Sequence, residues 1–535
     1  MKQLFLIFTL LTTLVYAQPP IQWENALGGT RAEGGFAISQ SDDGGYFTVG
    51  YTSSTDGDVI SGGGPMVFWI VKVDADGFLV WETSVGGAGT DVALDVDATT
   101  DGGCIVVGHT NSTGGDVSMA FGSADVWVIK LSSTGIVEWE KSFGGVDSDT
   151  GRSVQQTADG GYILGGFTSS SNIDGHRGAS DCWVIKLAPD GTMEWDGVYG
   201  GTGGEEIFAI QQTSDNGYVF AGISGMPNGD VTRTLGPSDC WVVRLDEFGA
   251  IIWEKAYGGN MGEFAYDIKQ TADNGFIVAG STASSNGDVT DYKGGYLDAW
   301  VFKINASGTI TWQKTLGGSN VELLYGVALT EDGGYIVTGY TESDDGDVSF
   351  NHGINDVWVV KLTAEGDIDW EKTLGGSIYD VGYDVIQADD GGYVITGYSQ
   401  SLDGDVSGGF GGQDLWVVKL HPEEKEDPVV VVEPEDPVVT VIPIPNAYLI
   451  PNVFTPNGDG VNDVYQLNVQ NSKQIDLVII NRWGNTVFKE KGLNPIWDGS
   501  IRGENCTDGT YFLKYQIIFE NDEKVAGQSI VQVQR

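Results

Sequence analysis

The feature that most constrains how this chain can fold is a repeat that carries two tryptophans per copy. Segments such as "DVWVVKL" recur with their tryptophans 56 to 59 residues apart, and a segment such as "IDWEKTLGG" follows each of them except the last. The chain also opens with such a tail, "IQWENALGG" at residues 21–29, and no repeat precedes it. The N-terminal fragment therefore supplies what the copy ending at Leu420 lacks.

Each copy contains four short segments with the character of β-strands. The last copy reads "YDVIQA", the turn "DDGG", "YVITGYS", the loop "QSLDGDVSGGFGGQ" and "DLWVVKL". Runs rich in Val, Ile, Tyr and Trp between Gly-rich turns are typical of antiparallel strands. The third segment is almost continuously apolar, which predicts that neighbouring sheets cover both of its faces. Seven such four-stranded sheets predict an all-β fold, a seven-bladed β-propeller over residues 18–420.

An open solenoid is the alternative arrangement for seven repeated sheets. The offset start favours the propeller, because a ring gains closure when an N-terminal strand completes the last blade, whereas an open array gains nothing. We therefore predict that residues 21–29 pair with the strand that ends at Leu420. The period exceeds those of WD40 and kelch repeats and their signatures are absent, so the repeat is assigned to no propeller family.

The segments outside the repeats have their own compositions. Residues 1–17, "MKQLFLIFTLLTTLVYA", combine a lysine, a short apolar run and a small final residue, as a cleaved secretory signal peptide does. No later segment is apolar enough to predict a membrane span. Residues 421–448 are rich in Pro, Glu and Val, which predicts a semi-extended linker. The strand-like segments of residues 449–535 predict a small Ig-like β-sandwich.

This last module carries a set of ordered motifs, "IPNVFTPNGDGVNDVYQL", "INRWGNTVF", "IWDG" and "DGTYFLKYQI". With them it resembles the gliding motility-associated C-terminal domain, the type B sorting domain of type IX secretion in Bacteroidetes. It departs from that family at "ENCTDG", where a Pro more often precedes the Asp-Gly. The resemblance implies engagement with the type IX machinery, passage through the periplasm, and then release or retention at the outer cell surface. It implies nothing about the ligand of the propeller.

Acidic residues dominate the charge of the chain. There are 75 Asp and Glu against 27 Lys and Arg, a formal net charge of −48. This balance argues against binding to the phosphates of nucleic acid and favours cations as partners. Cys182 and Cys240 occupy the same place in successive copies, which suggests either a bridge between neighbours or buried thiols, and we favour thiols because other copies have apolar residues there.

Two sets of acids are candidate calcium ligands. An acid stands four residues beyond each Gly-Gly, at the start of the strand expected to be innermost, and we predict either a calcium-binding ring at the channel mouth or capping of turn amides: Glu33, Asp91, Asp149, Glu205, Glu263, Glu322 and Asp380. The second set lies in "TPNGDGVND", where calcium binding and a structural Asx-turn cluster are both open: Asn457, Asp459, Asn462 and Asp463.

Most residues that recur in every copy are expected to have structural roles. The repeat tryptophans are expected to pack in the core rather than stack on sugars. The basic residue three positions after each "WVVKL"-type tryptophan, such as Lys130 or Lys361, is expected to extend along the strand surface or to pair with the acid after the second tryptophan, such as Glu140 or Glu371.

The middle copies break the symmetry of the repeat. Their loops between the second and third strands introduce basic and aromatic side chains into an otherwise acidic face: His176, Arg177, Arg233, Tyr292 and Lys293. We predict that these five residues, the basic patch, bind a ligand such as an acidic glycan, with ordinary loop drift as the alternative.

Three classes of function follow from these patterns. A monomeric secreted or surface protein that binds a glycan or another extracellular ligand comes first, because propeller loops form a wide recognition face. An extracellular carbohydrate-active hydrolase or lyase comes second, although the four histidines lie in unrelated contexts and we identify no catalytic constellation. A passive structural component of the surface is third.

Overall fold

The computed structural model describes residues 18–423, except 61 and 63, and residues 448–534, except 452, 457–462 and 502–503. The described residues form two compact units, the repeat region and a C-terminal module. Their regular elements are β-strands. The described residues contain no helix that is long and apolar enough to cross a membrane. The expected signal peptide, 1–17, and most of the expected linker, 421–448, lie outside the described residues.

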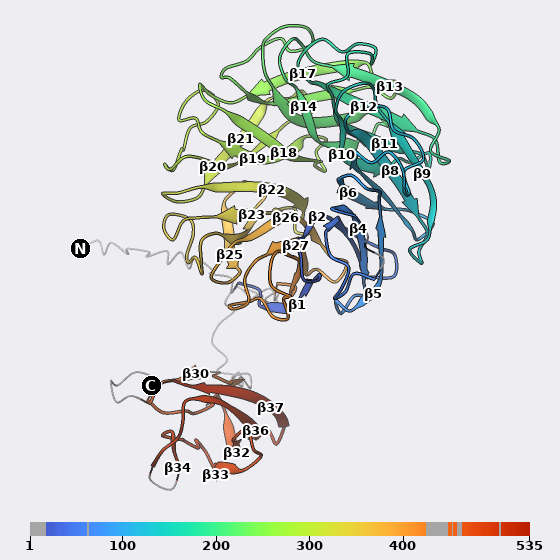
Figure 1. Cartoon of the computed structure of the whole chain (residues 1–535). Coiled ribbons are helices and arrows are strands. Elements are labelled where there is room, and N and C mark those ends of the chain that lie inside the picture. The colour runs from blue at the N-terminus through green and yellow to red at the C-terminus, as the bar shows by residue number, and fades with distance from the viewer. Residues whose placement is uncertain are drawn as a thin grey trace, which may run out of the picture. The chain divides into compact units, whose positions relative to one another are not determined.

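Seven four-stranded antiparallel sheets form the first unit, and Figure 1 shows them arranged around a common centre. The innermost strands are β2 (Glu33–Gln40), β6 (Asp91–Ala98), β10 (Asp149–Gln156), β14 (Glu206–Gln212), β18 (Glu263–Gln270), β22 (Glu322–Leu329) and β26 (Asp380–Gln387). The second strands are β3 (Tyr46–Thr52), β7 (Cys104–Thr110), β11 (Tyr162–Thr168), β15 (Tyr218–Ser224), β19 (Phe276–Thr282), β23 (Tyr335–Thr341) and β27 (Tyr393–Ser399).

The two outer positions of each sheet continue the same pattern. The third strands are β4 (Val67–Val73), β8 (Asp125–Leu131), β12 (Asp181–Leu187), β16 (Asp239–Leu245), β20 (Asp298–Ile304), β24 (Asp356–Leu362) and β28 (Asp414–Leu420). The outermost strands are β5 (Leu79–Val85), β9 (Val137–Phe143), β13 (Met193–Tyr199), β17 (Ile251–Tyr257), β21 (Ile310–Leu316), β25 (Ile368–Leu374) and β1 (Ile21–Leu27). We number the sheets as blades 1 to 7, so that blade 1 begins with β2 and blade 7 with β26.

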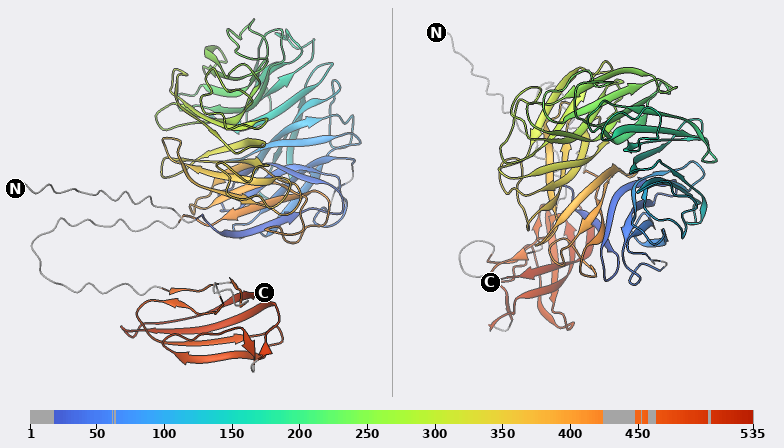
Figure 2. Two further views of the ribbon diagram at one scale, coloured as in Figure 1. Left: turned by 90° about the vertical axis from the view of Figure 1, so that its left-hand side faces the viewer. Right: turned by 45° about the horizontal axis from the view of Figure 1, so that its top comes forward.

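The ring closes through the N-terminal strand. Each innermost strand contacts the next, and β26 contacts β2. Strand β1 pairs antiparallel with β28, with Ile21 opposite Leu420 and Leu27 opposite Leu415. Both views in Figure 2 show the first and last blades side by side. The prediction of a seven-bladed propeller closed by residues 21–29 is therefore confirmed.

The third strands form the centre of each blade. Every residue of six of them, and all but one of β20, is buried. Their tryptophans are at most 3 % exposed, which confirms core packing at this position. Each indole N–H also donates to a polar side chain of the outermost strand at 2.7–3.0 Å, and in blade 7 Trp416 donates to Glu24 of β1. The closing strand therefore supplies an acceptor to the core.

The basic residue of each third strand has a partner other than the expected one. The six lysines pair with the Asp of the hairpin turn between the first two strands of their own blade, at 2.5–3.0 Å, and Arg244 pairs with Asp215 in the same way. The prediction that they pair with acids such as Glu140 and Glu371 is wrong. Successive side chains of a strand point to opposite faces of the sheet. The acids lie on the face of the tryptophans and accept their indole N–H groups, whereas the lysines point to the other face.

The four cysteines are buried, and Cys104, Cys182 and Cys240 of the repeat region are free. The prediction of buried thiols rather than a bridge between Cys182 and Cys240 is confirmed. Burial raises the pKa of both thiols well above the usual value, so they remain protonated at neutral pH.

The C-terminal module is also all-β. One five-stranded sheet has the order β30 (Val453–Phe454), β37 (Lys524–Val533), β36 (Gly509–Phe519), β32 (Ser472–Ile480) and β33 (Thr486–Gly492), with β30 parallel to β37. Two short pairs accompany it, β29 (Tyr448–Leu449) with β31 (Asn468–Val469), and β34 (Ser500–Ile501) with β35 (Glu504–Asn505). Trp497, Tyr465 and Leu477 lie in its single core.

Candidate functional site at the loop face and channel mouth

The acid that follows each Gly-Gly caps its own turn. All seven of these acids are 0 % exposed; six of them begin an innermost strand, and Glu205 directly precedes β14. Each accepts the N–H of the second Gly at 2.7–2.9 Å, and Glu33 also accepts the Thr52 hydroxyl at 2.9 Å. Across the described part of the chain, no group of three or more His, Cys, Asp and Glu side chains has the spacing of a metal site. The structure thus supports the capping interpretation and places the seven acids in seven separate turns.

A second acid reaches the same turn from the loop between the second and third strands. Six loop aspartates accept the N–H of the first Gly at 3.0–3.3 Å: Asp58, Asp116, Asp230, Asp288, Asp347 and Asp405. Each is the last residue of a "DGD" or "NGD" sequence, or of "GGD" in the case of Asp116. They explain why the loops of six copies share a Gly-Asp pair, since each Asp holds its loop against the turn of its own blade.

A third acid comes from the preceding blade and was not singled out from the sequence. It is the first residue of the third strand in six blades, where it is at most 3 % exposed: Asp125, Asp181, Asp239, Asp298, Asp356 and Asp414. Its signal in the sequence is an Asp that stands two residues before the tryptophan in six of seven copies, with Val67 in the exception. One of its carboxylate oxygens accepts an N–H of its own loop, as in the bond from Phe410 to Asp414 at 2.9 Å.

The other oxygen of this aspartate is often without a partner. In five of the six, Oδ1 is buried and makes no hydrogen bond: Asp125, Asp181, Asp298, Asp356 and Asp414. It faces the capping acid of the next blade, because a methyl group built on Gly28 would lie 2.5 Å from Glu33 Oε2 and 2.7 Å from Asp414 Oδ1. We call this place, where acids of two blades meet beside the first Gly of a turn, a blade junction. Burial and the nearby carboxylate Glu322 raise the pKa of Asp298 to about 7.

The structure assigns residues of the basic patch to separate blade junctions. Arg177 Nη1 lies 2.7 Å from Asp230 Oδ2 between blades 3 and 4, and His176 Nδ1 lies 2.8 Å from Asp181 Oδ2 there. Lys293 Nζ lies 3.4 Å from Asp347 Oδ2 between blades 5 and 6.

The remaining two patch residues, Arg233 and Tyr292, have different surroundings. Arg233 lies close enough to Asp239, between blades 4 and 5, to oppose the rise that burial causes in the pKa of that carboxyl. Tyr292 donates to the carbonyl of Gly295 within its own loop. Arg177, Arg233 and Lys293 therefore have a structural use as counter-charges at successive junctions. The role of the patch in ligand binding stays a prediction.

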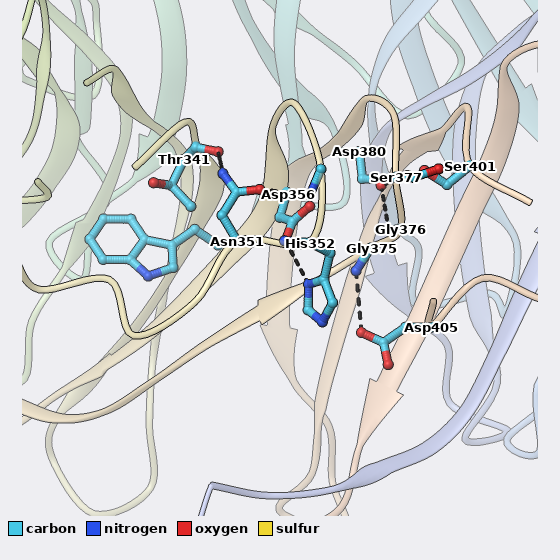
Figure 3. A network of polar contacts seen from close by, with 12 residues as sticks. Thr341, Asn351, His352, Asp356, Gly375, Gly376, Ser377, Asp380, Ser401 and Asp405 are labelled. Atoms are coloured by element: carbon cyan, nitrogen blue, oxygen red, sulfur yellow. Dashed lines mark hydrogen bonds and ion pairs between the residues drawn. The ribbon is translucent and has the colours of Figure 1, made fainter. Parts of the chain in front are cut away.

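A histidine outside the patch takes the same place between blades 6 and 7. Figure 3 shows this junction, where the His352 ring points toward Asp356 and Asp405 bonds to the main chain of Gly375. The distance between His352 Nδ1 and Asp356 Oδ2 is 2.6 Å. His352 has the chain position of Arg177, because the main-chain N–H of each donates to the Asp four residues later. Its ring pairs with that Asp, as the ring of His176 does with Asp181.

Farther into the propeller, aromatic rings from five blades surround the central channel. Phe36, three residues beyond Glu33, and its equivalents touch in a chain with ring centroids 4.8–5.1 Å apart: Phe208, Tyr266, Tyr325, Tyr383 and Phe36. Blade 3 contributes Arg152, whose guanidinium lies 5.1 Å from the Phe208 ring centroid and 5.9 Å from that of Phe167. We call these five rings with Arg152 the collar. It lines a cavity of about 110 Å³.

The collar was missed in the sequence for a physical reason. Each blade contributes one residue to it, at the same position of the innermost strand, so the site is made from the repeat rather than from a departure from it. When the seven copies are aligned, this position is aromatic in all copies except those of Leu94 and Arg152, and that recurrence was the signal available in the sequence. Arg152 pairs with Glu206 at 3.4 Å, and its buried Nε has no hydrogen-bond partner.

Below the collar, carboxylates link the innermost strands. Asp95 accepts the N–H of Val154 at 2.8 Å and Asp384 accepts that of Ile38 at 3.0 Å, so each connects its blade to the next. Lys269 Nζ lies 2.8 Å from Asp267 Oδ1 in this layer. Burial, opposed by the N–H of Val154 and by Lys269, raises the pKa of Asp95 to about 7, and burial raises that of Asp384 to about 7.

Raising the pH from about 5.5 to about 8 is expected to destabilise the propeller. An unfolded Asp has a pKa near 3.9, so between about pH 4 and 7 the folded chain holds protons on Asp95 and Asp384 that the unfolded chain has lost. The free energy of unfolding therefore falls as the pH rises through this window. At about 1.4 kcal/mol per unit of pKa difference, we expect a loss of about 1–3 kcal/mol. Denaturant titrations in chelating buffers measure it.

The control replaces both channel aspartates. The double variant Asp95→Asn with Asp384→Asn removes two of the titrating groups and should make the profile less steep. Burial raises the pKa of Asp97 to about 6, and burial and the nearby carboxylate Glu322 raise that of Asp298 to about 7, so both still titrate in this window. A profile as steep as that of the unchanged chain would assign the pH dependence to other groups.

The calcium candidates of the C-terminal module are placed only in part. Asn457, Asp459 and Asn462 lie outside the described residues. Asp463 is described but is half-buried in a loop. An Asx-turn cluster and a calcium site therefore both stay predictions for this segment.

Comparison with known proteins identifies the C-terminal module. Residues 448–533 match the family model of the CHU_C Type IX secretion signal domain. This match agrees with the resemblance of the sequence motifs and shows that the chain carries a type IX secretion signal, which implies export to the cell surface or beyond. No curated protein matches the chain.

Three similar solved structures are distant in sequence. Puromycin hydrolase is 12 % identical over 71 % of this chain and 53 % of its own, with a TM-score of 0.41. The extracellular domain of a hybrid two-component system of B. thetaiotaomicron is 9 % identical over 94 % and 72 %, with a TM-score of 0.23. A Bombyx mori GH32 beta-fructofuranosidase is 12 % identical over 76 % and 90 %, with a TM-score of 0.27. This chain spans about half the length of puromycin hydrolase, and at these scores none of the likenesses bears on function.

Proposed function

We propose that the chain, whose C-terminal module is a type IX secretion signal domain, is a surface or released propeller that binds an extracellular glycan at its channel mouth. The collar carries this proposal. Five aromatic rings from five blades and one guanidinium converge on a single opening, and aromatic faces stack on sugar rings while a guanidinium binds a carboxylate or sulfate.

The size of the cavity restricts how such a ligand would sit. A volume of about 110 Å³ is small beside the several hundred Å³ usual for a whole small-molecule ligand. It suits one substituent of a larger molecule that lies across the loop face. The buried Nε of Arg152, which has no hydrogen-bond partner, is the donor that such an anionic substituent would use.

The chemistry of the layer below favours binding over catalysis. Asp95 and Asp384 accept main-chain N–H groups of neighbouring blades, and Asp267 is paired with Lys269. Carboxylates used in this way connect strands and are poorly placed to approach a substrate as a general acid and base.

An array of acidic and neutral glycans tests the proposal. The Arg152→Met variant keeps an unbranched side chain between Phe167 and Phe208 but loses the charge, and we expect its affinity for an acidic glycan to fall at least about tenfold, as for a lost charged hydrogen bond. Arg31→Met is the matched control, because Arg31 is exposed on the loop face and donates to the Ser53 carbonyl at 3.2 Å.

A third variant separates the collar from the basic patch. Changing Arg177, Arg233 and Lys293 together to Ala should leave collar binding largely intact, with circular dichroism confirming the fold. Equal binding by the unchanged chain and Arg152→Met would refute the collar as the site. Loss of binding only in the triple variant would assign the ligand to the patch instead.

A further inference from the structure

Three cavities lie on the face of the propeller opposite the loop face, each between two neighbouring blades. This face, which we call the turn face, carries the hairpin turns within each blade. The cavity between blades 3 and 4 has a volume of about 510 Å³, against about 240 Å³ between blades 5 and 6 and about 140 Å³ between blades 6 and 7. Several hundred Å³ is the usual size of a small-molecule site. The first cavity, the turn-face groove, is therefore large enough to hold a ligand.

The smallest of the three cavities shows what its walls can bind. Trp370 of blade 6 and Tyr393 of blade 7 lie beside it. The indole N–H of Trp370 donates to Glu423 Oε1 at 2.7 Å, and the Tyr393 hydroxyl lies 2.9 Å from the same oxygen. Glu423 follows β28, the last strand of the propeller, and is part of no blade. A tryptophan and a tyrosine in these positions can thus bind an oxygen that comes from outside the blades.

The equivalent pair in the turn-face groove is free. Trp195 of blade 3 and Tyr218 of blade 4 have ring centroids 5.8 Å apart. Among the described residues, neither the indole N–H of Trp195 nor the Tyr218 hydroxyl has a hydrogen-bond partner. Burial and the nearby carboxylates Asp159, Glu194 and Glu247 raise the pKa of Tyr218 to about 12, so its hydroxyl keeps its proton at neutral pH. Indoles of four other blades donate to a carbonyl in the turn of the next blade at 3.1–3.2 Å: Trp23, Trp81, Trp253 and Trp312.

The turn-face groove also has an aromatic platform and oxygen acceptors. Phe248 lies in the turn of blade 4 and is 77 % exposed, with Glu247 beside it. The carboxylates of Asp159 and Glu194 share Lys186, at 3.0 and 3.1 Å from its Nζ. The other five turns of this kind have a polar residue in place of Phe248: Asp76, Thr134, Asp190, Ser307 and Glu365. The groove between blades 3 and 4 therefore differs from its equivalents in carrying an exposed ring.

We propose that the turn-face groove binds a neutral saccharide, with Trp195 and Tyr218 as donors, Glu247 as an acceptor and Phe248 as the surface on which a sugar ring packs. Sugar hydroxyls donate and accept, so one ligand can use both kinds of group, and the apolar face of a sugar ring packs on an aromatic ring. A cation would use the acceptors alone. An anion would be repelled by Glu247, since no described basic side chain pairs with it. This site is separate from the collar and does not rest on it.

Saturation-transfer NMR and calorimetry of the full chain with cellobiose, maltose, lactose, mannobiose and chitobiose test the proposal. At least one of these neutral disaccharides should bind. Phe248→Ser, which introduces the residue type that blade 5 has at Ser307, should weaken that binding at least about tenfold, because a buried apolar contact is lost. Phe78→Ser is the matched control and should leave the binding unchanged, because Phe78 is 70 % exposed on the turn face of blade 1.

A second pair of variants tests the indole N–H. Trp195→Phe keeps an aromatic ring but removes the donor, and it should weaken the same binding about three- to tenfold, as for a lost neutral hydrogen bond. Trp139→Phe is the control, because the indole N–H of Trp139 also has no described partner but the turn beside it has Asp190 in place of Phe248. Arg152→Met should bind the disaccharide as the unchanged chain does, which separates this site from the collar. Melting temperatures confirm that each variant is folded.

Three results would overturn the proposal. The first is that the unchanged chain binds none of the five disaccharides. The second is a disaccharide affinity that stays the same in Phe248→Ser and Trp195→Phe. The third is binding of a lysine-rich peptide in place of the sugars, lost in Phe248→Ser, which would assign the groove to a cationic ligand.

Discussion

Deletion of residues 18–29 is expected to prevent the propeller from closing and to produce aggregation. The deletion removes β1, so β28 becomes an open edge that can pair with other chains. It also removes Glu24, which accepts the indole N–H of Trp416 at 2.8 Å, and an unpaired buried donor alone costs about 1–3 kcal/mol. Size-exclusion chromatography and thermal melting of the truncated chain measure the effect.

A permuted chain provides the matched control. Residues 18–29 placed after Leu420 through a short flexible linker would offer the same strand to the same edge and should restore a monomer with nearly the original melting temperature. A truncated chain that stayed monomeric and melted at the same temperature would contradict the structural role of β1.

Removal of residues 449–535 is expected to eliminate export while leaving the propeller folded. The two units have separate cores, so the truncation removes no part of any blade. Because the lost module matches the type IX secretion signal domain, the truncated chain should accumulate in the periplasm and be almost absent from the surface and the medium. Fractionation and immunoblotting of the host measure the distribution.

A fusion tests whether the module is sufficient. Residues 421–535 attached to a reporter with a cleavable signal peptide should carry the reporter out of the cell. Normal surface or medium levels of the truncated propeller would remove the sorting role of the module.

The sequence predicted those parts of the fold that are set within one copy of the repeat. The four strands of a blade follow from runs of Val, Ile and Tyr between Gly-rich turns, and the offset fragment at residues 21–29 predicted how the ring closes. The distribution of charged partners could not be predicted, because it depends on which face of a strand a side chain occupies. Lys361 and Trp358 are three residues apart but lie on opposite faces, and so Glu371 bonds to Trp358 whereas Lys361 pairs with Asp332.

Contacts between blades could not be predicted from the sequence for a different reason. Arg177 and Asp230 belong to different copies, and no pattern within a copy indicates that they meet. A departure from the repeat is no guide to the collar, because Tyr266, Tyr325 and Tyr383 form a site by recurring. A single Asp at the start of an apolar strand, such as Asp414, resembles an ordinary strand boundary until the next blade is placed against it.

The bond between Trp416 and Glu24 joins residues 392 positions apart. During synthesis β1 emerges first, and its only strand partner, β28, emerges after all the other blades. Forming this long-range contact is slow compared with pairing inside a blade, because a large loop must close first. Blades 1 to 6 can assemble as they appear, but a nascent or truncated chain keeps a loose N-terminal segment. We therefore expect the N-terminal segment to be open to proteolysis until β28 emerges, and to be protected once the ring has closed.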